Sequence, residues 1–492
     1  MEETIWEHVQ DFFEGAVFVY GTTLLVVYAL LAIMSLIAIT RFKRREKNID
    51  DEKMLGSPIA PGISVIAPAF NEGLTIIGNV RSLLTLNYPH FEIIIVNDGS
   101  SDDTLEQMIV EFELVKVDFA FSARIKTQPV RGVYKSTNSA YSKLLVIDKV
   151  NGKSKADAVN AAINIATFNY FLCTDVDCIL EKNTLLKLIK PVMSEEKKRV
   201  IATGATLRMV NSCDVDEGVI TRVRPPRQIL PRFQEMEYLR AFVLGKMGWS
   251  WINCVPNVSG GLGLFDKEVA IKAGGYDHKS FGEDMELMTR MVRYAYDNKI
   301  DYAIRYIPIT LCWTEGPSTV KIFMRQRTRW SRGLSQLMFA HIKMLFNPRY
   351  GRMGLIVFPY NFFFELLAPI IEFLGVIYYI VLICLGMINW HFAILLLIFV
   401  YTYSIMISTT AILWDQITFR YYKSWKEVAS LCVMPFYEMI LYHPMIMVFA
   451  LRGYYYFLTG KKHTWGNMQR KGFNTTAAKM ATANNNNTQA VK

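Results

Sequence analysis

The sequence lacks several patterns that would have placed it in a common class of protein. Its seven cysteines form no Cys-x-x-Cys pair and no metal-ligand spacing with histidine, so reduced thiols are expected. No basic run is interleaved with stacking aromatic residues, which excludes nucleic acid as the expected partner despite a net charge of +10. Lysine and arginine gather beside apolar segments instead, which indicates contact with a lipid bilayer.

Charged residues are absent from 16–40, a stretch of 25 residues. At about 1.5 Å per residue this length spans a hydrocarbon core of roughly 30 Å, so it predicts a transmembrane helix. Residues 1–15 are acidic and lack the basic start of a signal peptide, and they are expected outside the cytoplasm. The basic residues within 41–45 favour a cytosolic location for the middle of the chain.

The segment 60–316 alternates short β-rich runs with polar helical stretches. The runs ISVIAP, FEIIIVN and YFLCT predict strands, and DDTLEQMIVEFELV predicts a helix. This alternation predicts an α/β Rossmann-like domain, with a mostly parallel sheet that has helices on both faces. In such sheets ligands bind at the carboxyl ends of the strands.

Acidic residues follow two of these predicted strands. Asp98 follows FEIIIVN, and Asp175 and Asp177 follow YFLCT. Paired carboxylates can hold Mg²⁺ or Mn²⁺ and leave coordination sites for phosphate oxygens, so a nucleotide diphosphate is the expected ligand. Solvated or helix-capping aspartates are the alternative. A second Asp-x-Asp, at 214–216, lies in a polar stretch and is expected in a surface loop.

Seven motifs occur in an order that is far more specific than any one of them. They are APAFNE (67–72), VNDGSSDDT (96–104), KADAVNAAI (155–163), DVD (175–177), SGGLGLF (259–265), GEDMELMTRM (282–291) and QRTRW (326–330). Together they resemble the family 2 glycosyltransferases, in the membrane-embedded branch of cellulose, hyaluronan and poly-N-acetylglucosamine synthases. The resemblance covers roughly residues 60–385. It implies a GT-A fold, inversion at the anomeric carbon, UDP-sugar donors and a divalent metal ion.

The same resemblance implies which residues bind the donor. Asp98 would help to hold the uridine, and Asp175 and Asp177 would bind the metal and the diphosphate. Glu72 and Lys155 are further donor-binding positions. Lys155 could meet a phosphate as a point charge, or it could be solvated on its helix.

Asp284 matches the catalytic base of the family. Displacement at an anomeric carbon requires that the attacking hydroxyl loses its proton, and a carboxylate within hydrogen-bond reach can take it. The alternative is a helix-start carboxylate that caps free amides, and both roles can hold together. Glu283 is a second candidate at this position. SGGLGLF is expected to let the backbone approach the sugar closely, or to form a tight turn.

Residues 317–362 contain a basic amphipathic helix of the type that lies in a membrane interface. Gln326, Arg329 and Trp330 fall on one face of it. Trp330 would stack on the acceptor sugar, and Arg329 or Arg327 would steady the departing diphosphate. The alternative is a basic helix that binds anionic lipids without a catalytic role.

The remaining apolar segments predict further membrane contacts. Residues 363–415 predict two transmembrane helices, and 416–460, interrupted by Pro435 and Pro444, favours an interfacial or re-entrant hairpin over a crossing helix. The linker 41–59 is basic, and the tail 461–492 is basic and then disordered in composition.

Glu365 and Glu372 are ionisable residues within the first of these predicted spans. Their spacing of seven places them on one helical face, where they would line a channel for sugar or reach toward the interface.

The motifs and spans lead to one main hypothesis and two alternatives. The main hypothesis is a multi-pass enzyme of the inner or plasma membrane with a cytoplasmic catalytic domain. It would extend a β-linked exopolysaccharide processively from a UDP-sugar, for example UDP-N-acetylglucosamine, and move it outward. The alternatives are a transferase that adds one sugar to a lipid acceptor, and a non-catalytic scaffold or channel. An accessory export subunit is a further partner to test.

Overall fold

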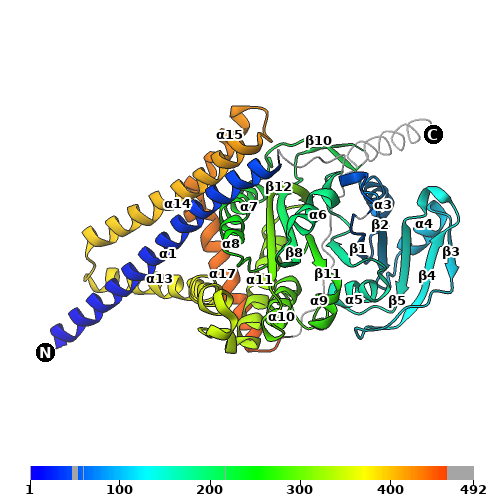
Figure 1. Cartoon of the computed structure of the whole chain (residues 1–492). Helices are drawn as coiled ribbons and strands as arrows, with labels where there is room; N and C mark the ends of the chain where they lie inside the picture. The colour runs from blue at the N-terminus through cyan, green and yellow to red at the C-terminus, as the bar shows by residue number, and fades with distance from the viewer. Residues whose placement is uncertain (1, 47–53, 59, 217, 462–492) are drawn as a thin grey trace, which may run out of the picture.

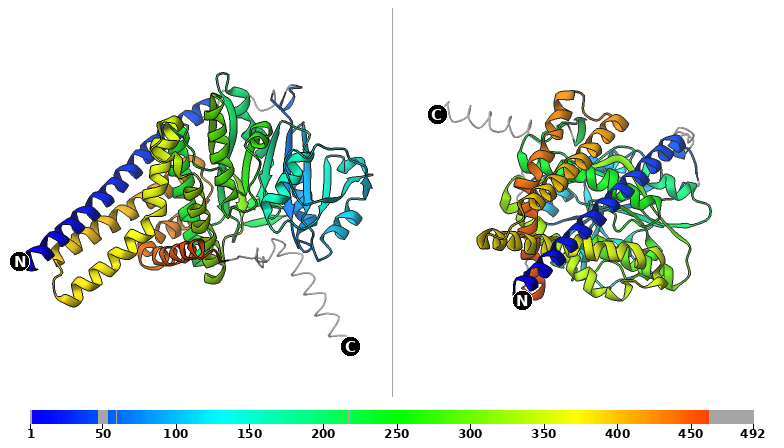
Figure 2. Two further views of the ribbon diagram at one scale, coloured as in Figure 1. Left: turned by 90° about the horizontal axis from the view of Figure 1, so that it is seen from below. Right: turned by 90° about the vertical axis from the view of Figure 1, so that its left-hand side faces the viewer.

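The computed structural model describes residues 2–461 apart from 47–53, 59 and 217. An α/β domain occupies one end, and three long helices extend from it on one side, α1 (Glu2–Glu46), α13 (Ala368–Leu385) and α14 (Trp390–Phe419) (Figure 1). The views in Figure 2 show that these helices run side by side. Because α1 is continuous from Glu2, the acidic residues 2–15 extend the predicted membrane helix and do not form a separate segment.

A ten-stranded sheet forms the centre of the α/β domain. Its order is β3-β4-β5-β2-β1-β6-β11-β8-β12-β7. The strands in chain order are β1 (Ile63–Ala69), β2 (Phe91–Asn97), β3 (Leu114–Val117), β4 (Val130–Ser136), β5 (Leu144–Lys149), β6 (Tyr170–Thr174), β7 (Ile179–Leu180), β8 (Arg199–Met209), β11 (Leu262–Asp266) and β12 (Tyr302–Thr314).

The prediction of a mostly parallel sheet is correct only for its centre. Strands β5, β2, β1 and β6 are parallel, but β4 and β11 run antiparallel to both of their neighbours. The connection from β4 to β5, 137–143, is too short for a crossover between parallel neighbours. The sheet is therefore mixed. Isoleucines 93–95 of β2 are fully buried, as expected for a strand that is covered on both faces.

Helices cover the sheet and continue into the membrane-side part of the molecule. Their bounds are α3 (Ile76–Leu84), α4 (Thr104–Glu111), α5 (Lys155–Ile165), α6 (Thr184–Ser194), α7 (Ile229–Leu239), α8 (Met247–Trp251), α9 (Lys267–Lys272), α10 (Glu283–Asp297), α11 (Val320–Ala340), α12 (Phe358–Tyr360), α15 (Trp425–Cys432), α16 (Met434–Tyr437) and α17 (His443–Leu458). Short π-helical segments are η2 (Arg240–Lys246), η5 (Met353–Val357), η6 (Asn361–Leu366) and η7 (Glu438–Tyr442).

Two local predictions need correction. The helix expected over 102–115 ends at Glu111, because Leu114 begins strand β3. The second Asp-x-Asp is not in a loop: it forms β9 (Asp214–Asp216), which pairs antiparallel with β10 (Val219–Arg222). Both of its aspartates are exposed, so this pair is on the surface as expected.

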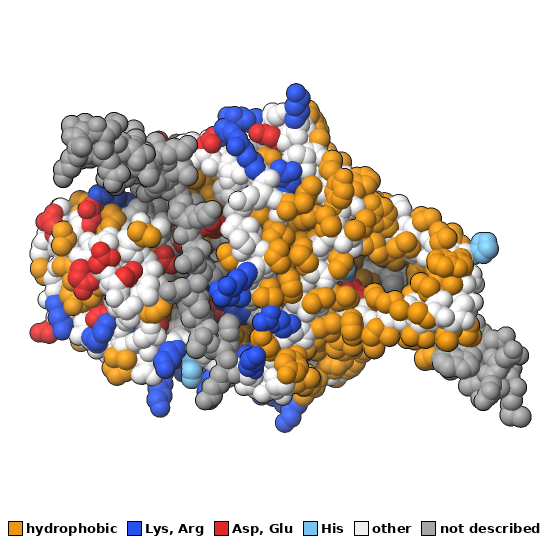
Figure 3. Space-filling model, turned by 180° about the vertical axis from the view of Figure 1, so that it is seen from behind, with side chains coloured by type: hydrophobic (Ala, Val, Ile, Leu, Met, Phe, Trp, Pro, Cys, Tyr) orange, Lys and Arg blue, Asp and Glu red, His pale blue; other side chains and the backbone are white. Residues whose placement is uncertain are grey.

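Among the described residues, four helical segments are long and apolar enough to cross a membrane: Phe12–Glu46, Met353–Leu385, Trp390–Phe419 and Trp425–Leu458. Hydrophobic side chains cover this end of the molecule (Figure 3). The last segment breaks into α15, α16, η7 and α17, and Pro435 and Pro444 lie at the starts of α16 and α17. The interfacial hairpin stays a prediction for this segment, and the disordered tail lies outside the described residues.

A buried ion-pair network joins the sheet to the membrane-side helices. Arg208 of β8 is fully buried, and its guanidinium donates to Glu235 of α7 at 2.7 Å and to the Asp415 carboxylate of α14. It also donates to the hydroxyls of Thr310 and Tyr422, each at 3.0 Å. This network fixes the α/β domain against α14.

Candidate active site

Parallel pairing brings the predicted donor-binding residues to one edge of the sheet. Strands β2 and β6 flank β1 and run parallel to it, so Asp98 and Asp175 emerge at the same edge. Glu72, just after β1, lies there too, and its backbone N–H donates to the Thr104 hydroxyl at 2.9 Å. These residues come together as the sequence predicted.

Asp98 is held by a lysine that the sequence did not single out. Lys149 Nζ lies 2.6 Å from an Asp98 oxygen, and the Gly152 N–H donates to the same oxygen at 3.0 Å. Lys149 is fully buried and also pairs with Asp157 at 2.6 Å. Burial raises the pKa of Asp98, and the Lys149 contact opposes that rise. The signal in the sequence that could have indicated Lys149 was its position at the end of strand β5, at this same edge of the sheet.

Asp175, Asp177 and Cys178 form a group that fits a metal ion. One ligand atom from each lies within 4.8 Å of the others, and Asp177 is only 5% exposed. The thiol of Cys178 has a pKa well above its ordinary value, because it interacts with the Cys312 thiol and is buried. Asp175 and Asp177 offer carboxylate oxygens as ligands. Oxygen ligands fit Mg²⁺ or Mn²⁺.

Lys155 links this group to the glycine turn of SGGLGLF. It is the first residue of α5, whose N-terminus is capped by the Ser154 hydroxyl. Its ammonium group donates to the Asp175 carboxylate and to the Gly260 carbonyl at 2.8 Å. Burial alone would lower the pKa of Lys155, but nearby carboxylates, Asp175 foremost, raise it above the ordinary value. Lys155 is buried, so the solvated alternative is wrong.

Two glycines lie between the metal group and Asp284. A Cβ on Gly260 would lie 3.4 Å from an Asp284 oxygen, and a Cβ on Gly261 would lie 3.5 Å from an Asp175 oxygen. A methyl group at either position would lie in van der Waals contact with one of these carboxylates. The glycine turn therefore lies beside both Asp175 and Asp284.

Asp284 and Glu283 are the first two acidic residues of α10. An Asp284 oxygen accepts a hydrogen bond from the Met285 N–H at 2.8 Å, so the helix-start interaction is present beside any catalytic role. The pKa of Glu283 is raised by burial and then by the Asp284 charge, while Arg329 and Lys155 oppose the rise. The Glu283 carboxylate therefore interacts with the negative charge of Asp284 and with the positive charges of Arg329 and Lys155.

QRTRW lies on α11, which packs directly on the start of α10. A Cβ on Gly333 would lie 2.7 Å from the Gly282 nitrogen and 2.9 Å from the Phe281 carbonyl carbon. Only a residue without a side chain allows this approach. The contact places Arg329 close enough to Glu283 to influence its pKa.

Arg327 differs from Arg329, because its guanidinium forms an ion pair with Glu237. Its Nη1 donates to Glu237 at 2.7 Å, and its Nη2 donates to the Tyr442 hydroxyl at 2.9 Å. Trp330 lies beside this guanidinium, 4.6 Å from ring centroid to Cζ. Gln326 accepts from Gln234 at 3.3 Å. The leaving-group role stays a prediction, and among the described residues Arg329, unlike Arg327, forms no ion pair.

Gly333→Ala is expected to lower both the unfolding temperature and the transfer rate. The added methyl group would meet backbone atoms of 281–282, and overpacking of this kind costs about 1–3 kcal/mol. Differential scanning fluorimetry and UDP release would measure the two effects. Gly375→Ala is the matched control, since its Cβ meets nothing within 4 Å. Wild-type stability and rate in Gly333→Ala would contradict this account.

Lys246 is a second site residue that the sequence analysis missed. Its Nζ donates to the Ser259 hydroxyl at 3.2 Å, at the start of the glycine turn. Burial lowers its pKa to about 8, and the negative charge of Asp284 opposes this shift. The ammonium group lies over the rings of Phe242 and Tyr306, 4.6 and 5.6 Å from their centroids. Its only signal was one lysine within the apolar run 241–249.

The two predicted channel glutamates lie in successive helical segments, η6 and α13. Glu365 lies in the π-helical segment η6 and accepts from the Tyr360 hydroxyl at 3.0 Å. Glu372 lies in α13 and contacts His443 at 3.0 Å. A channel role stays a prediction for both.

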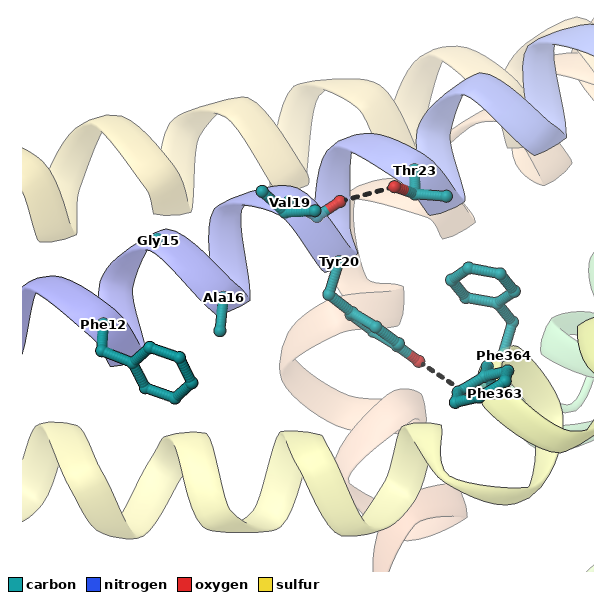
Figure 4. Close-up of a pocket in the computed structure, with 8 residues that line it drawn as sticks. All are labelled: Phe12, Gly15, Ala16, Val19, Tyr20, Thr23, Phe363 and Phe364. Carbon is teal, nitrogen blue, oxygen red and sulfur yellow. Dashed lines mark hydrogen bonds between the residues drawn. The ribbon is translucent and has the colours of Figure 1, made fainter.

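A hollow of about 590 Å³ lies between α1 and η6. Figure 4 shows its lining, in which the Tyr20 hydroxyl donates to the Phe363 carbonyl at 3.0 Å. The lining is otherwise dominated by apolar side chains and includes neither Glu365 nor Glu372. Such a surface suits lipid chains better than a polymer rich in hydroxyl groups.

The fold and the carboxylates at its sheet edge define a glycosyltransferase of the GT-A class. The model of glycosyl transferase family 2 matches residues 64–212, and that of glycosyl transferase family group 2 matches 228–421. The chain belongs to the family 2 glycosyltransferases, as its motifs predicted. Its apolar helices make it a membrane protein of that family.

Similar proteins include synthases of one polysaccharide. A poly-beta-1,6-N-acetyl-D-glucosamine synthase of Staphylococcus epidermidis is 28% identical over 55% of this chain and 54% of its own length. The probable glycosyltransferase YdaM of Bacillus subtilis is 26% identical over 62% of each chain. The chain thus spans little more than half the length of these relatives. A mannosyltransferase of Pyrobaculum calidifontis, solved with GDP-Man and Mn²⁺, has a TM-score of 0.47 and 16% identity, over 89% of this chain and 100% of that one.

Proposed function

We propose that this protein extends a β-linked exopolysaccharide by inverting transfer from a UDP-sugar. The observation that carries the proposal is that one glycine turn, Gly260 and Gly261, lies beside both the predicted base Asp284 and the predicted metal ligand Asp175, which is grouped with Asp177. An attacking hydroxyl and a departing diphosphate must be served from opposite sides of the anomeric carbon. A base and a metal group that adjoin the same turn could serve the two sides of a sugar bound there.

The residues of the chain would divide the reaction as follows. Asp284 accepts the proton of the acceptor hydroxyl as it attacks the anomeric carbon. Asp98 binds the uridine, and Arg329 and Lys155 interact with the diphosphate as cations. A divalent ion held by Asp175 and Asp177 would supply Lewis-acid stabilisation of the charge that develops on the leaving group. Trp330 would provide the stacking surface for the acceptor sugar.

The donor and product are proposed from the named relatives. Because several similar proteins are named poly-beta-1,6-N-acetyl-D-glucosamine synthases, we propose UDP-N-acetylglucosamine as donor and a poly-N-acetylglucosamine as product. Basic residues at the end of α1 support a cytoplasmic catalytic domain in the inner or plasma membrane. Processive transfer and outward movement of the polymer are part of the same proposal.

The deciding experiment uses the full chain in lipid nanodiscs with a panel of UDP-sugars and either Mg²⁺ or Mn²⁺. UDP release identifies the donor, and the product length distinguishes repeated from single transfer. Long products from one UDP-sugar are expected. A product with one added sugar on a lipid would overturn the polymerase proposal, and no UDP release from any donor would overturn the enzymatic one.

Asp177→Asn tests the metal role separately from turnover. Loss of one charged oxygen ligand is expected to weaken Mn²⁺-dependent UDP binding by about 10-fold or more, as removal of an ionised partner from a buried site commonly costs over 1.4 kcal/mol. Isothermal titration of UDP with and without Mn²⁺ measures the effect. Asp216→Asn, in the exposed second Asp-x-Asp, is the matched control. Unchanged metal dependence in Asp177→Asn would remove Asp177 from the metal site.

A further inference from the structure

A basic pocket of about 300 Å³ lies between α11, the end of α17 and Phe281. Six cationic residues line it: Lys321, Arg325, Arg329, Arg332, Arg452 and Lys461. No aspartate or glutamate is among its described lining residues, and within the described part of the chain none of the six forms an ion pair. So many like charges repel one another unless an anion joins them.

Arg332 has no charge partner among the described residues of this pocket. Its side chain is only 9% exposed, and its Nε and Nη1 atoms have no hydrogen-bond partner among the described residues. Its guanidinium carbon lies 4.2 Å from the centroid of the Phe281 ring. A buried guanidinium with two unmatched donors is costly, and a phosphate group, with several acceptor oxygens, would satisfy it.

The position of the pocket favours a lipid as the source of that phosphate. Arg452 and Lys461 flank the end of the last apolar segment, Trp425–Leu458. Leu458 and Tyr455 beside them are 78% and 59% exposed, so acyl chains would find an apolar surface next to the cations. Figure 3 shows Lys and Arg side chains along the border of the hydrophobic surface. Cation clusters at this level of a membrane protein attract anionic headgroups.

The pocket is distinct from the metal group of the active site. Neither Asp175 nor Asp177 lines it, whereas a donor diphosphate is expected to lie against both. Arg329 is shared between them, since it lines the pocket and influences Glu283. A ligand in the pocket would therefore touch the same arginine that faces the catalytic helix.

We infer that this pocket binds the phosphate headgroup of an anionic phospholipid, which thereby holds α11 and α17 together beside the active site. Gly453 of α17 already packs tightly there, since a Cβ on it would lie 2.7 Å from the Thr328 carbonyl oxygen of α11. The headgroup would bridge cations of both helices. The inference does not depend on which sugar is transferred, because its test is lipid binding.

The test compares phosphatidylglycerol with phosphatidylcholine on the purified full chain. The variant K321Q/R325Q/R452Q removes three exposed lining charges. At about 1 kcal/mol for each cation, the affinity for phosphatidylglycerol should fall roughly 100-fold. Lipid titration followed by native mass spectrometry and by the shift of the unfolding temperature gives two readouts. Arg332→Met tests the contribution of the buried Arg332 guanidinium. If this variant does not fold, R452Q alone is measured in its place.

The control K423Q/K426Q removes two exposed charges near the start of the last apolar segment, outside the pocket. It should retain wild-type phosphatidylglycerol binding. Two competition measurements identify the source of the phosphate. One adds UDP with Mn²⁺ to the lipid-bound protein, and the other adds inorganic phosphate. Phosphatidylglycerol binding that persists under saturating UDP supports the inference. Displacement of the lipid by UDP, an equal response to phosphatidylcholine, or wild-type lipid affinity in K321Q/R325Q/R452Q would overturn it.

Discussion

Asp284→Asn is expected to reduce the rate of sugar transfer by about 10²- to 10⁴-fold, the range that a general base contributes. The amide keeps the size of the side chain and its oxygen can still accept from the Met285 N–H, as the carboxylate does at 2.8 Å. The start of α10 should therefore remain intact. What the variant loses is the ability to take a proton from the acceptor hydroxyl.

Steady-state UDP release and isothermal titration of UDP separate these effects. The rate should fall while UDP affinity stays close to that of the wild type, because Asp284 is not one of the grouped residues that would hold the metal ion and the diphosphate. Asp297→Asn removes a carboxylate from the far end of the same helix and should leave turnover unchanged. Full turnover in Asp284→Asn would remove Asp284 as the base. An equal loss in Glu283→Gln, with Asp284→Asn active, would transfer the role to Glu283.

The strands that carry the donor-binding residues could be predicted because their signals are local. FEIIIVN and YFLCT are short β-rich runs that are each followed by a carboxylate, and the structure gives β2 and β6 the same bounds. Both strands pair parallel with β1, and helix α3 makes the crossover from β1 to β2. The direction of β11 could not be predicted. It runs antiparallel between β6 and β8, and the long segment that leads to it from β8 gives no local signal of its direction.

The missed residues are those whose function depends on distant partners. Lys149 and Lys246 stand singly in apolar runs, where a lysine gives no local pattern, and their partners Asp98 and Ser259 lie 51 and 13 residues away. Arg327 was proposed as an alternative to Arg329 from the chemistry of its guanidinium, which cannot show that Glu237 on another helix already binds it. The arginine beside it, Arg329, has no such described ion pair and faces the site.

Arg208→Met is expected to destabilise the protein by about 3–5 kcal/mol, the cost of removing one partner from a buried ion pair. Methionine fills much of the arginine volume, but Glu235 and Asp415 would then stay buried without a counter-charge. Since Asp415 lies on α14, the contact between the sheet and the membrane-side helices should loosen first. A lower unfolding temperature and faster proteolysis between the two parts would measure this.

Two comparisons separate the charge effect from a loss of packing. Arg224→Met removes a partner of the exposed ion pair with Asp214, so it should cost only about 0–1 kcal/mol. The triple variant R208M/E235Q/D415N removes the buried charges together and should recover part of the lost stability, because the penalty comes from unpaired charge. If the triple variant is no more stable than Arg208→Met, shape and hydrogen bonding, and not charge pairing, hold the catalytic domain on α14. The order wild type, triple variant, Arg208→Met in unfolding temperature would establish the ion pair as the coupling between sheet and membrane helices.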